Sequence, residues 1–587
     1  MNSSASPSLA THQQAGGKLR STFLRADLAA PVICILFGLT ISVMPHLVWW
    51  AQTGSPVWIA DNDELLYLSY ASQAYFNHPA YLGDPVLTVH GPAMYPWLQL
   101  VPGVLVAKLL GLGPLAISLI WRAWAGASIA LGWYVVAKLY VKETWYSAAL
   151  SGILMADCGL VAAHPFWRQT LIVTHLLAGR TQGILDRNPA IHAEWRIITP
   201  GLSLAYLLLH IWLVARARQV PSRQRILLAG LGLGILFYAY FFYWTAACLA
   251  LLVALLLDAK GRKVYWQTAC IGVLVGLPSA LATFVLKRAA SPDWPVRTDL
   301  AIHIPRFSEL LVPKIALVLL GATFLWIWKR RKDLAYIWAL AFSAMLLMNH
   351  QIFTAMQTQN EHWAYVWGPC LTFLLVLGAG QALGHLISQK RLASFALVAF
   401  VLAYLATGLW LRVVEARSTR ESTEFTGMYA HYREQINSTQ SALASNAVVA
   451  GDKSFVELAA ILNNLRPLDH YAVVMSPSVD NSEWDSRVAL NGFLNGLDRE
   501  AFAESQREVL DHAVWGLEAR SPIQKANRLA NRIRIYDEIT TNPGPAIGRF
   551  QVKYVALSRK DSSPPSYLTA NWHKVSNGPY WQVWERE

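Results

Sequence analysis

The chain has 587 residues, of which 54% are hydrophobic and 14% charged, whereas a soluble protein of this length carries about 25% charged residues. This composition predicts a membrane protein. The net charge of +13 does not indicate a nucleic-acid partner, because Lys and Arg fall in short loops between apolar runs, where they would anchor the cytoplasmic side of a membrane protein. The cysteines form no CxxC pair and lie inside apolar runs, which indicates core residues; they are Cys34, Cys158, Cys248, Cys270 and Cys370.

Residues 1–28 are rich in Ser, Gln and Gly, with Lys18, Arg20 and Arg25 just before the first apolar run. We expect a disordered cytoplasmic N-terminus here. The apolar run at 29–50 is too long for the core of a signal peptide and lacks a clear cleavage site, so it predicts an uncleaved first membrane span.

The segment after this span opens with four polar residues, Asp61-Asn62-Asp63-Glu64, called here the acidic quartet. Three carboxylates this close repel one another, and a site that holds them usually contains a cation or a proton. The alternative is ordinary loop charge or the first turn of a helix that Asn62 caps. In a helix, Asp61 and Glu64 would share a face, while Asp63 would point elsewhere.

The stretch from Met94 to Leu112 is apolar but contains Pro96, Pro102 and Lys108. If it crossed the membrane, every later basic loop would lie on the wrong side. We therefore predict a helix that lies on or dips into the outer face. The basic loops that would face the cytoplasm are at 138–142, 216–225, 260–263, 329–332 and 390–391.

These rules predict about eleven spans and a mainly α, polytopic transmembrane helix bundle over 29–412. The first outer segment is 51–113, and the tail at 413–587 lies outside. The spans are expected at about 29–50, 114–137, 146–163, 198–215, 226–241, 242–258, 264–286, 312–328, 334–349, 364–386 and 393–412.

Two further outer segments are polar. In 164–197, Arg168 and Arg196 adjoin the neighbouring spans and are candidates for binding a lipid phosphate, although solvated charges on an interfacial helix would give the same pattern. His90 precedes a Gly-Pro turn and is a further substrate-binding candidate, with a turn role as the alternative. The segment 350–362 supplies candidates for binding a hydroxyl-rich ligand or, alternatively, for satisfying helix-end carbonyls: His350, Gln351, Gln357 and His362.

The tail at 413–587 alternates helical and strand patterns, which predicts a soluble α/β domain. Strands are expected at 447–450, 471–475, 553–558 and 580–584. Helices are expected at about 420–444, from Ser454, at 483–508 and at 522–541.

The order of these features resembles the GT-C superfamily of polyprenyl-phosphate-sugar-dependent glycosyltransferases. The similarity lies in the acidic pair Asp63-Glu64 followed by Tyr67, in Gly91-Pro92-Ala93-Met94-Tyr95-Pro96 leading to Leu110-Gly111, and in Trp121-Arg122 of the next span. It covers roughly residues 29–260, and the tail matches loosely.

The resemblance implies an inverting hexosyl- or pentosyltransferase of a bacterial-type cytoplasmic membrane, with a periplasmic tail. It would move a sugar from a polyprenyl-phosphate donor to an envelope glycan, lipid or protein. One carboxylate of Asp61, Asp63 and Glu64 would be the general base, with Asp63 favoured, and the same three could hold a divalent cation, Mg²⁺ or Mn²⁺. The alternatives are a lipid-linked sugar transporter or flippase, for which Asp157 and His210 are the notable mid-span polar residues, and a non-catalytic envelope-assembly protein.

Overall fold

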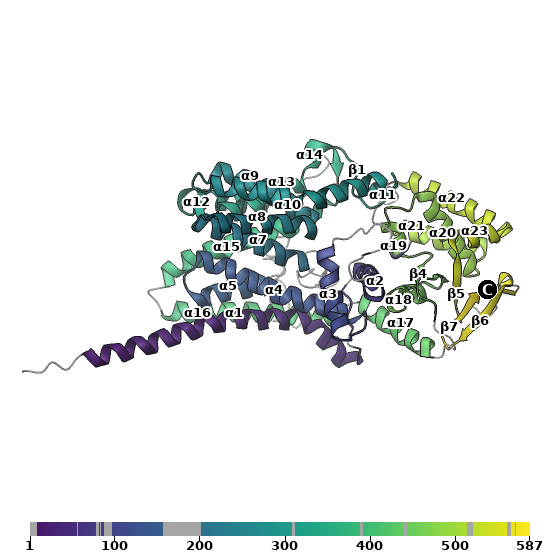
Figure 1. The fold of residues 1–587 in the computed structure, drawn as a ribbon, viewed down its shortest axis with the longest axis horizontal. Helices are drawn as coiled ribbons and strands as arrows, with labels where there is room; N and C mark the ends of the chain where they lie inside the picture. The colour runs from purple at the N-terminus through teal and green to yellow at the C-terminus, as the bar shows by residue number, and fades with distance from the viewer. Residues whose placement is uncertain are drawn as a thin grey trace, which may run out of the picture.

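A computed structural model describes the chain at 9–55, 57–60, 62–77, 82, 84–86, 97–156, 201–307, 311–387, 391–418, 420–437, 443–513, 521–559, 565–569 and 571–587. A bundle of long helices occupies one end of the molecule, and a sheet flanked by helices occupies the other (Figure 1). Asp61, His90, Asp157, Arg168 and Arg196 lie outside the described residues.

Each of the eleven stretches predicted as spans coincides with a helix in the described residues. The helices are α1 (Leu9–Thr53), α4 (Ala116–Tyr140), α5 (Thr144–Ala156), α7 (Ser203–Gln219), α8 (Arg223–Ala239), α9 (Phe241–Leu257), α10 (Arg262–Ala289), α12 (Lys314–Arg330), α13 (Ala335–Met348), α15 (Ala364–Ile387) and α16 (Arg391–Ser418).

Five helices in the described part of the chain are long and apolar enough to cross a membrane: they lie on α1, α4, α10, α16 and a segment, Asn360–Leu383, that includes most of α15. Large apolar side chains such as Leu274 and Phe395 stand exposed on them, as lipid contact requires. The chain is therefore a multi-pass membrane protein. The count of eleven spans stays a prediction, since α7, α8, α9 and α12 have 17 residues each.

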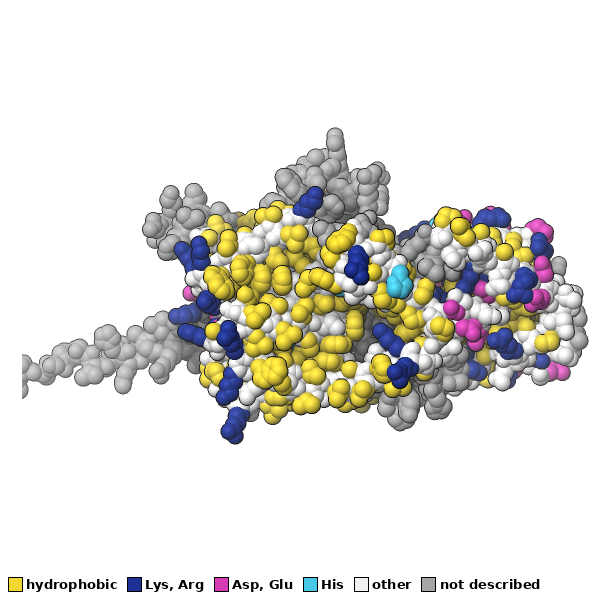
Figure 2. All heavy atoms as spheres, turned by 90° about the horizontal axis from the view of Figure 1, so that it is seen from above, with side chains coloured by type: hydrophobic (Ala, Val, Ile, Leu, Met, Phe, Trp, Pro, Cys, Tyr) yellow, Lys and Arg dark blue, Asp and Glu magenta, His cyan; other side chains and the backbone are white. Residues whose placement is uncertain are grey.

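The two ends of the molecule differ in how charged side chains are distributed over their surfaces. Apolar side chains cover the visible flank of the bundle, while Lys and Arg gather at the end far from the sheet (Figure 2). Side chains of both signs cover the sheet region. This distribution agrees with the cytoplasmic placement expected for the basic loops, although the orientation in the membrane stays a prediction.

Helix α1 is longer than the first predicted span, since it begins at Leu9 and continues without a break into that span. The disordered cytoplasmic N-terminus expected over 1–28 stays a prediction. Leu, Ala, Gln, Lys and Arg are common in this stretch, and their high helix propensity lets the helix extend beyond the apolar run.

Shorter elements occupy the end of the bundle nearest the sheet. They are α2 (Asn62–Phe76), α3 (Trp97–Leu109), α11 (Trp294–Arg297), β1 (Ile302–His303), α14 (Gln351–Thr354), β2 (Met356–Gln357) and the 3-10 turn η3 (Asn360–Trp363). The 3-10 turn η2 (Lys332–Leu334) precedes α13. The helix expected within Met94–Leu112 is present as α3, and its position at a membrane surface stays a prediction.

The tail contains a five-stranded mixed sheet in the order β4-β3-β5-β7-β6. Its strands are β3 (Val448–Gly451), β4 (Arg466–Pro467), β5 (Val552–Ser558), β6 (Trp572–Asn577) and β7 (Trp581–Arg586). β3 runs parallel to β4 and β5, and β5, β7 and β6 are antiparallel. The helices are α17 (Arg420–Asn437), α18 (Lys453–Leu462), α19 (Tyr471–Met475), α20 (Asn481–Leu494), α21 (Arg499–Asp511), α22 (Pro522–Thr541) and α23 (Pro543–Phe550), and a 3-10 turn, η4 (Ser566–Thr569), follows β5.

Two expectations for the tail are wrong. Residues 471–475 form helix α19 rather than a strand, because the His470 side chain accepts the Ala472 N–H and caps a helical turn. The helix expected over 483–508 is two helices. Gly496 adopts φ +73° and Asp498 caps α21 by accepting the Ala501 N–H, so the chain turns between them.

A segment of the tail, 474–481, fastens the sheet region to the bundle and is called here the strap. Arg297 of α11, which is 3% exposed, donates to the carbonyl oxygens of Val474, Ser476 and Val479 at 2.8 to 3.0 Å. On the other side, the Ser476 hydroxyl donates to the buried carboxylate of Asp84 in the first outer segment. The strap therefore joins the segments around Asp84 and Arg297, which connect helices of the bundle, to the tail.

Candidate functional site

A buried ion pair organises the first turn of α2. Both guanidinium nitrogens Nη1 and Nη2 of Arg122, on α4, donate to the carboxylate of Glu64, with 2.8 Å between Nη1 and Oε1. The Ser118 hydroxyl donates to the same carboxylate, and the Ala60 N–H donates to Oε2 at 3.0 Å. Glu64 and Arg122 are 1% and 0% exposed. This bidentate geometry fixes the start of α2 against α4.

Three other elements close around the pair. Nε2 of His46, on α1, lies 3.1 Å from Arg122 Nη1, and the guanidinium stacks over the Trp58 ring at 4.8 Å. Ser422 of α17 bonds both the N–H and the carbonyl of Ile59 at 2.8 and 2.7 Å. The segment that leads into the acidic quartet is thereby held by residues of α1, α4 and α17, which lie far apart in the sequence.

Close packing of α1 on α4 makes this cluster possible. A Cβ atom on Gly38 would lie 2.2 Å from the Gly126 carbonyl oxygen, and one on Gly126 would lie 2.2 Å from the Ser42 hydroxyl. Only glycine allows this approach, as at small-residue contacts between membrane helices. Gly126 lies one turn from Arg122, so the same contact brings Arg122 beside His46.

Asp63 is adjacent to Glu64 in the first turn of α2 and is partly exposed. Because Glu64 uses both carboxylate oxygens on Arg122, Ser118 and Ala60, the two acidic neighbours in this turn stand in different environments. The catalytic assignments of Asp61, Asp63 and Glu64 remain predictions.

The candidates in 350–362 form a second polar cluster. Nδ1 of His350 lies 2.9 Å from the Leu347 carbonyl, and Gln351 accepts from Asn360 Nδ2 at 2.9 Å. His362 Nδ1 pairs with the Tyr240 hydroxyl. Burial lowers the pKa of His350. The contact of His350 with the Leu347 carbonyl matches the alternative stated above, in which these side chains satisfy carbonyls at a helix end. Gln357 pairs with Ile302 across β1 and β2.

The two clusters are separate in the described residues. Helix α2 packs on α3, α4 and α18, whereas η3 packs on α9, α13 and α15. Figure 1 draws α2 and α14 well apart. The expectation that the quartet and 350–362 line one cavity with Arg168 or Arg196 therefore gains no support, and both arginines and His90 lie outside the described residues.

Metal binding is the second role that the sequence predicts for the carboxylates of the acidic quartet. In the described ranges, no three His, Cys, Asp or Glu side chains come together as a metal site would require. Glu64 does not fit a ligand role as arranged, since Arg122 already neutralises its charge. Asp63 and the undescribed Asp61 remain the candidates for a cation.

Sequence reasoning missed several residues of these contacts. His46, Ser118 and Ser422 sit within helices as isolated polar residues. Arg297 ends the four-residue helix α11, and neither it nor Asp84 belongs to a recognisable motif. Arg122 had a signal, because an Arg inside an apolar span requires a buried partner. The mid-span His210 also has a buried partner. Its Nε2 lies 2.7 Å from the Tyr336 hydroxyl, and this contact gives His210 a structural role.

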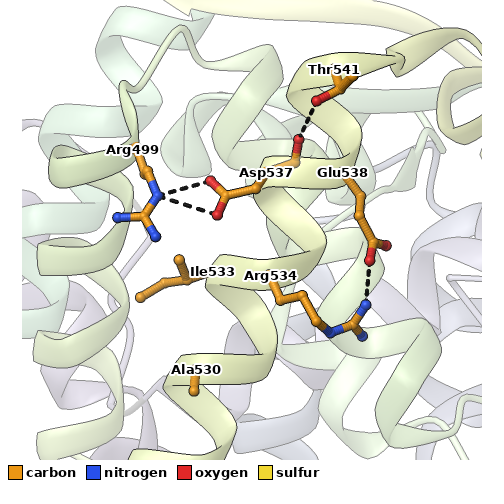
Figure 3. Close-up of a pocket in the computed structure, with 7 residues that line it drawn as sticks. All are labelled: Arg499, Ala530, Ile533, Arg534, Asp537, Glu538 and Thr541. Atoms are coloured by element: carbon orange, nitrogen blue, oxygen red, sulfur yellow. Dashed lines mark hydrogen bonds and ion pairs between the residues drawn. The ribbon is translucent and has the colours of Figure 1, made fainter.

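One surface hollow lies on the tail between α21 and α22 (Figure 3). Its charged side chains pair with each other, Arg499 with Asp537 at 2.9 Å and Arg534 with Glu538. Figure 3 shows both pairs, so these charged side chains neutralise each other.

No protein-family model matches the chain, and no characterised protein sequence is significantly similar to it. Among solved structures, the chain is similar to ArnT from Cupriavidus metallidurans bound to undecaprenyl phosphate. The identity is 12%, the match covers 94% of this chain and 97% of ArnT, and the TM-score is 0.40.

Proposed function

We propose that this chain is a membrane glycosyltransferase of GT-C type that moves a sugar from a polyprenyl-phosphate donor to an acceptor hydroxyl, with Asp63 as the general base. The ion pair of Glu64 with Arg122 carries the proposal. It commits one carboxylate of the quartet to holding α2 and leaves the base role to Asp63 or Asp61.

The chemistry needs a base and an anion-binding group. The acceptor hydroxyl attacks the anomeric carbon and gives its proton to the carboxylate, while the bond from that carbon to the phosphate oxygen breaks. A positioned base contributes about 10² to 10⁴ in rate. Arg168 and Arg196 are proposed to neutralise the departing lipid phosphate. A divalent cation held by Asp63 and Asp61 could serve the same purpose.

Single variants test the base. We expect D63N to lower sugar transfer in membranes by about 10² to 10⁴ at an unchanged protein level, because an amide cannot take the proton. E64Q should instead lower the protein level. Transfer would be measured as surface glycan or as lipid-linked sugar consumed, with and without Mg²⁺ or Mn²⁺.

The exposed tail residue Asp511 supplies a matched control, and D511N should leave transfer unchanged. If D61N, D63N and E64Q all retain full glycosylation, the chain is not a glycosyltransferase of this type. If D61N fails and D63N does not, the base is Asp61.

A further inference from the structure

A short two-stranded element stands between the bundle and the tail, and it presents apolar side chains outward. β1 and β2 pair through Ile302 with Gln357 and His303 with Met356, and the Ile304 N–H donates to the Ala355 carbonyl at 3.1 Å. Phe307 follows β1 and is 82% exposed, and Phe353 of α14 precedes β2 and is 68% exposed. The pairing holds both rings on one element.

The element lies at the outer ends of membrane helices. Phe353 comes shortly after the end of α13 at Met348, and Phe307 comes shortly before the start of α12 at Lys314. The adjoining helix ends expose Phe284 and Val285 on α10 and Ile315 on α12. Only 11% of the apolar stretch of α10 is buried in the protein, so its surface faces lipid. Both rings therefore stand in segments that directly adjoin the ends of membrane helices.

Basic side chains accompany the rings. Arg306 is exposed beside Phe307, and Lys314, Lys287 and Arg288 are exposed at the same helix ends. Exposed aromatic rings in water are unfavourable, whereas rings beside Lys and Arg are typical of segments that lie at a bilayer surface, where phosphate headgroups attract the charges.

From this placement we infer that the β1–β2 element is a membrane-docking surface, in which Phe307 and Phe353 insert into the leaflet on the side of the tail and Arg306 contacts lipid phosphate. It would hold the segments 298–307 and 351–359 at a fixed depth. Gln359 ties the two segments together beyond the strand pairing, since its side chain donates to the Thr298 carbonyl at 2.8 Å.

Spin labels measure the depth without any assay of activity. In a variant whose five cysteines are replaced by Ala, F307C and F353C would each carry a nitroxide and be reconstituted in vesicles of phosphatidylethanolamine and phosphatidylglycerol. We expect both labels to collide more with oxygen, which partitions into the bilayer, than with a water-soluble nickel chelate. I523C is the matched control, because Ile523 is 71% exposed on the tail and its label should favour the nickel chelate.

Two outcomes would overturn the inference. Labels at 307 and 353 that meet the nickel chelate as freely as the label at 523 would place the element in water. Labels shielded from both reagents, with spin–spin broadening, would show a second copy of the chain on this surface.

A second experiment, photolabelling from the lipid, can be done on the wild-type chain. Lipids with a photoreactive group just below the headgroup should label peptides containing 302–307 and 351–357. Labelling of α10 peptides without labelling of these two would reject the docking surface. Replacing Arg306 by Gln should reduce the labelling, and more so as the phosphatidylglycerol fraction rises.

Discussion

The first turn of α2 and the segment 350–362 read alike as sequence, since both place polar residues at the outer end of apolar helices, yet the structure builds them differently. Around Glu64, side chains from α1 and α4 meet at a buried ion pair, and Ser422 of α17 holds the main chain just before it. In 350–362, most polar side chains bond to main chain or to neighbours on the same segment.

This difference separates long-range from local roles. A charge pair between α2 and α4 can fix the position of a turn that carries candidate catalytic residues. Side chains that satisfy local carbonyls mainly stabilise the path of their own loop. The following variants probe that distinction, from the largest expected effect to the smallest.

Replacing Arg122 should give the largest loss in the free energy of unfolding. R122M leaves Glu64 buried and unpaired, and we expect about 3 to 5 kcal/mol of lost stability. Thermal unfolding in detergent and the amount of protein in membranes would report it. The exposed pair Arg420 with Glu424 is the control, and R420A should cost at most about 1 kcal/mol.

The double variant E64L with R122M sharpens this test. Removing both charges should recover much of the stability lost by R122M, because the cost comes from the stranded carboxylate. A double variant that loses the sum of the two single effects would mean that the pair is not the organising contact.

Replacing Arg297 should give the second largest loss in the free energy of unfolding. R297K keeps the charge but loses the forked donors that reach three carbonyls of the strap, so we expect about 1.5 to 3 kcal/mol of lost stability. Limited proteolysis should also cut more readily between the bundle and the sheet. The exposed Arg499 is the matched control, and equal protease resistance of R297K and R499K would show that the strap does not depend on Arg297.

His350 should give the smallest effect, and one that depends on pH. Burial lowers its pKa in the folded chain, so the unfolded chain binds the proton more readily. Stability from this group is full above the unfolded pKa of about 6.5 and falls as the pH drops below it. H350Q should therefore flatten the decline in unfolding temperature between pH 7.5 and pH 5.5, and an unchanged slope would contradict this role.

Much of the helical architecture could be predicted because it depends on local composition. Apolar runs bounded by basic loops located eleven helices, and capping residues such as Asp452 and Ser521 stand where α18 and α22 begin. Sequence patterns gave the wrong element where contacts with other parts of the fold determine the secondary structure. The YAVVM run of α19 has strand-forming residues, but β4 occupies the sheet edge beside β3 and His470 caps a helix instead.

The sequence by itself determined that this chain is a membrane protein with an α/β tail and that an acidic turn follows its first span, because hydrophobicity, charge placement and periodicity are local properties. Only the tertiary structure decided which carboxylate is neutralised, since the partner of Glu64 lies 58 residues away on α4. It also decided that the strap contacts both Asp84 and Arg297. Such contacts arise from helix packing at Gly38 and Gly126 and from the fold of the tail, which no local pattern encodes.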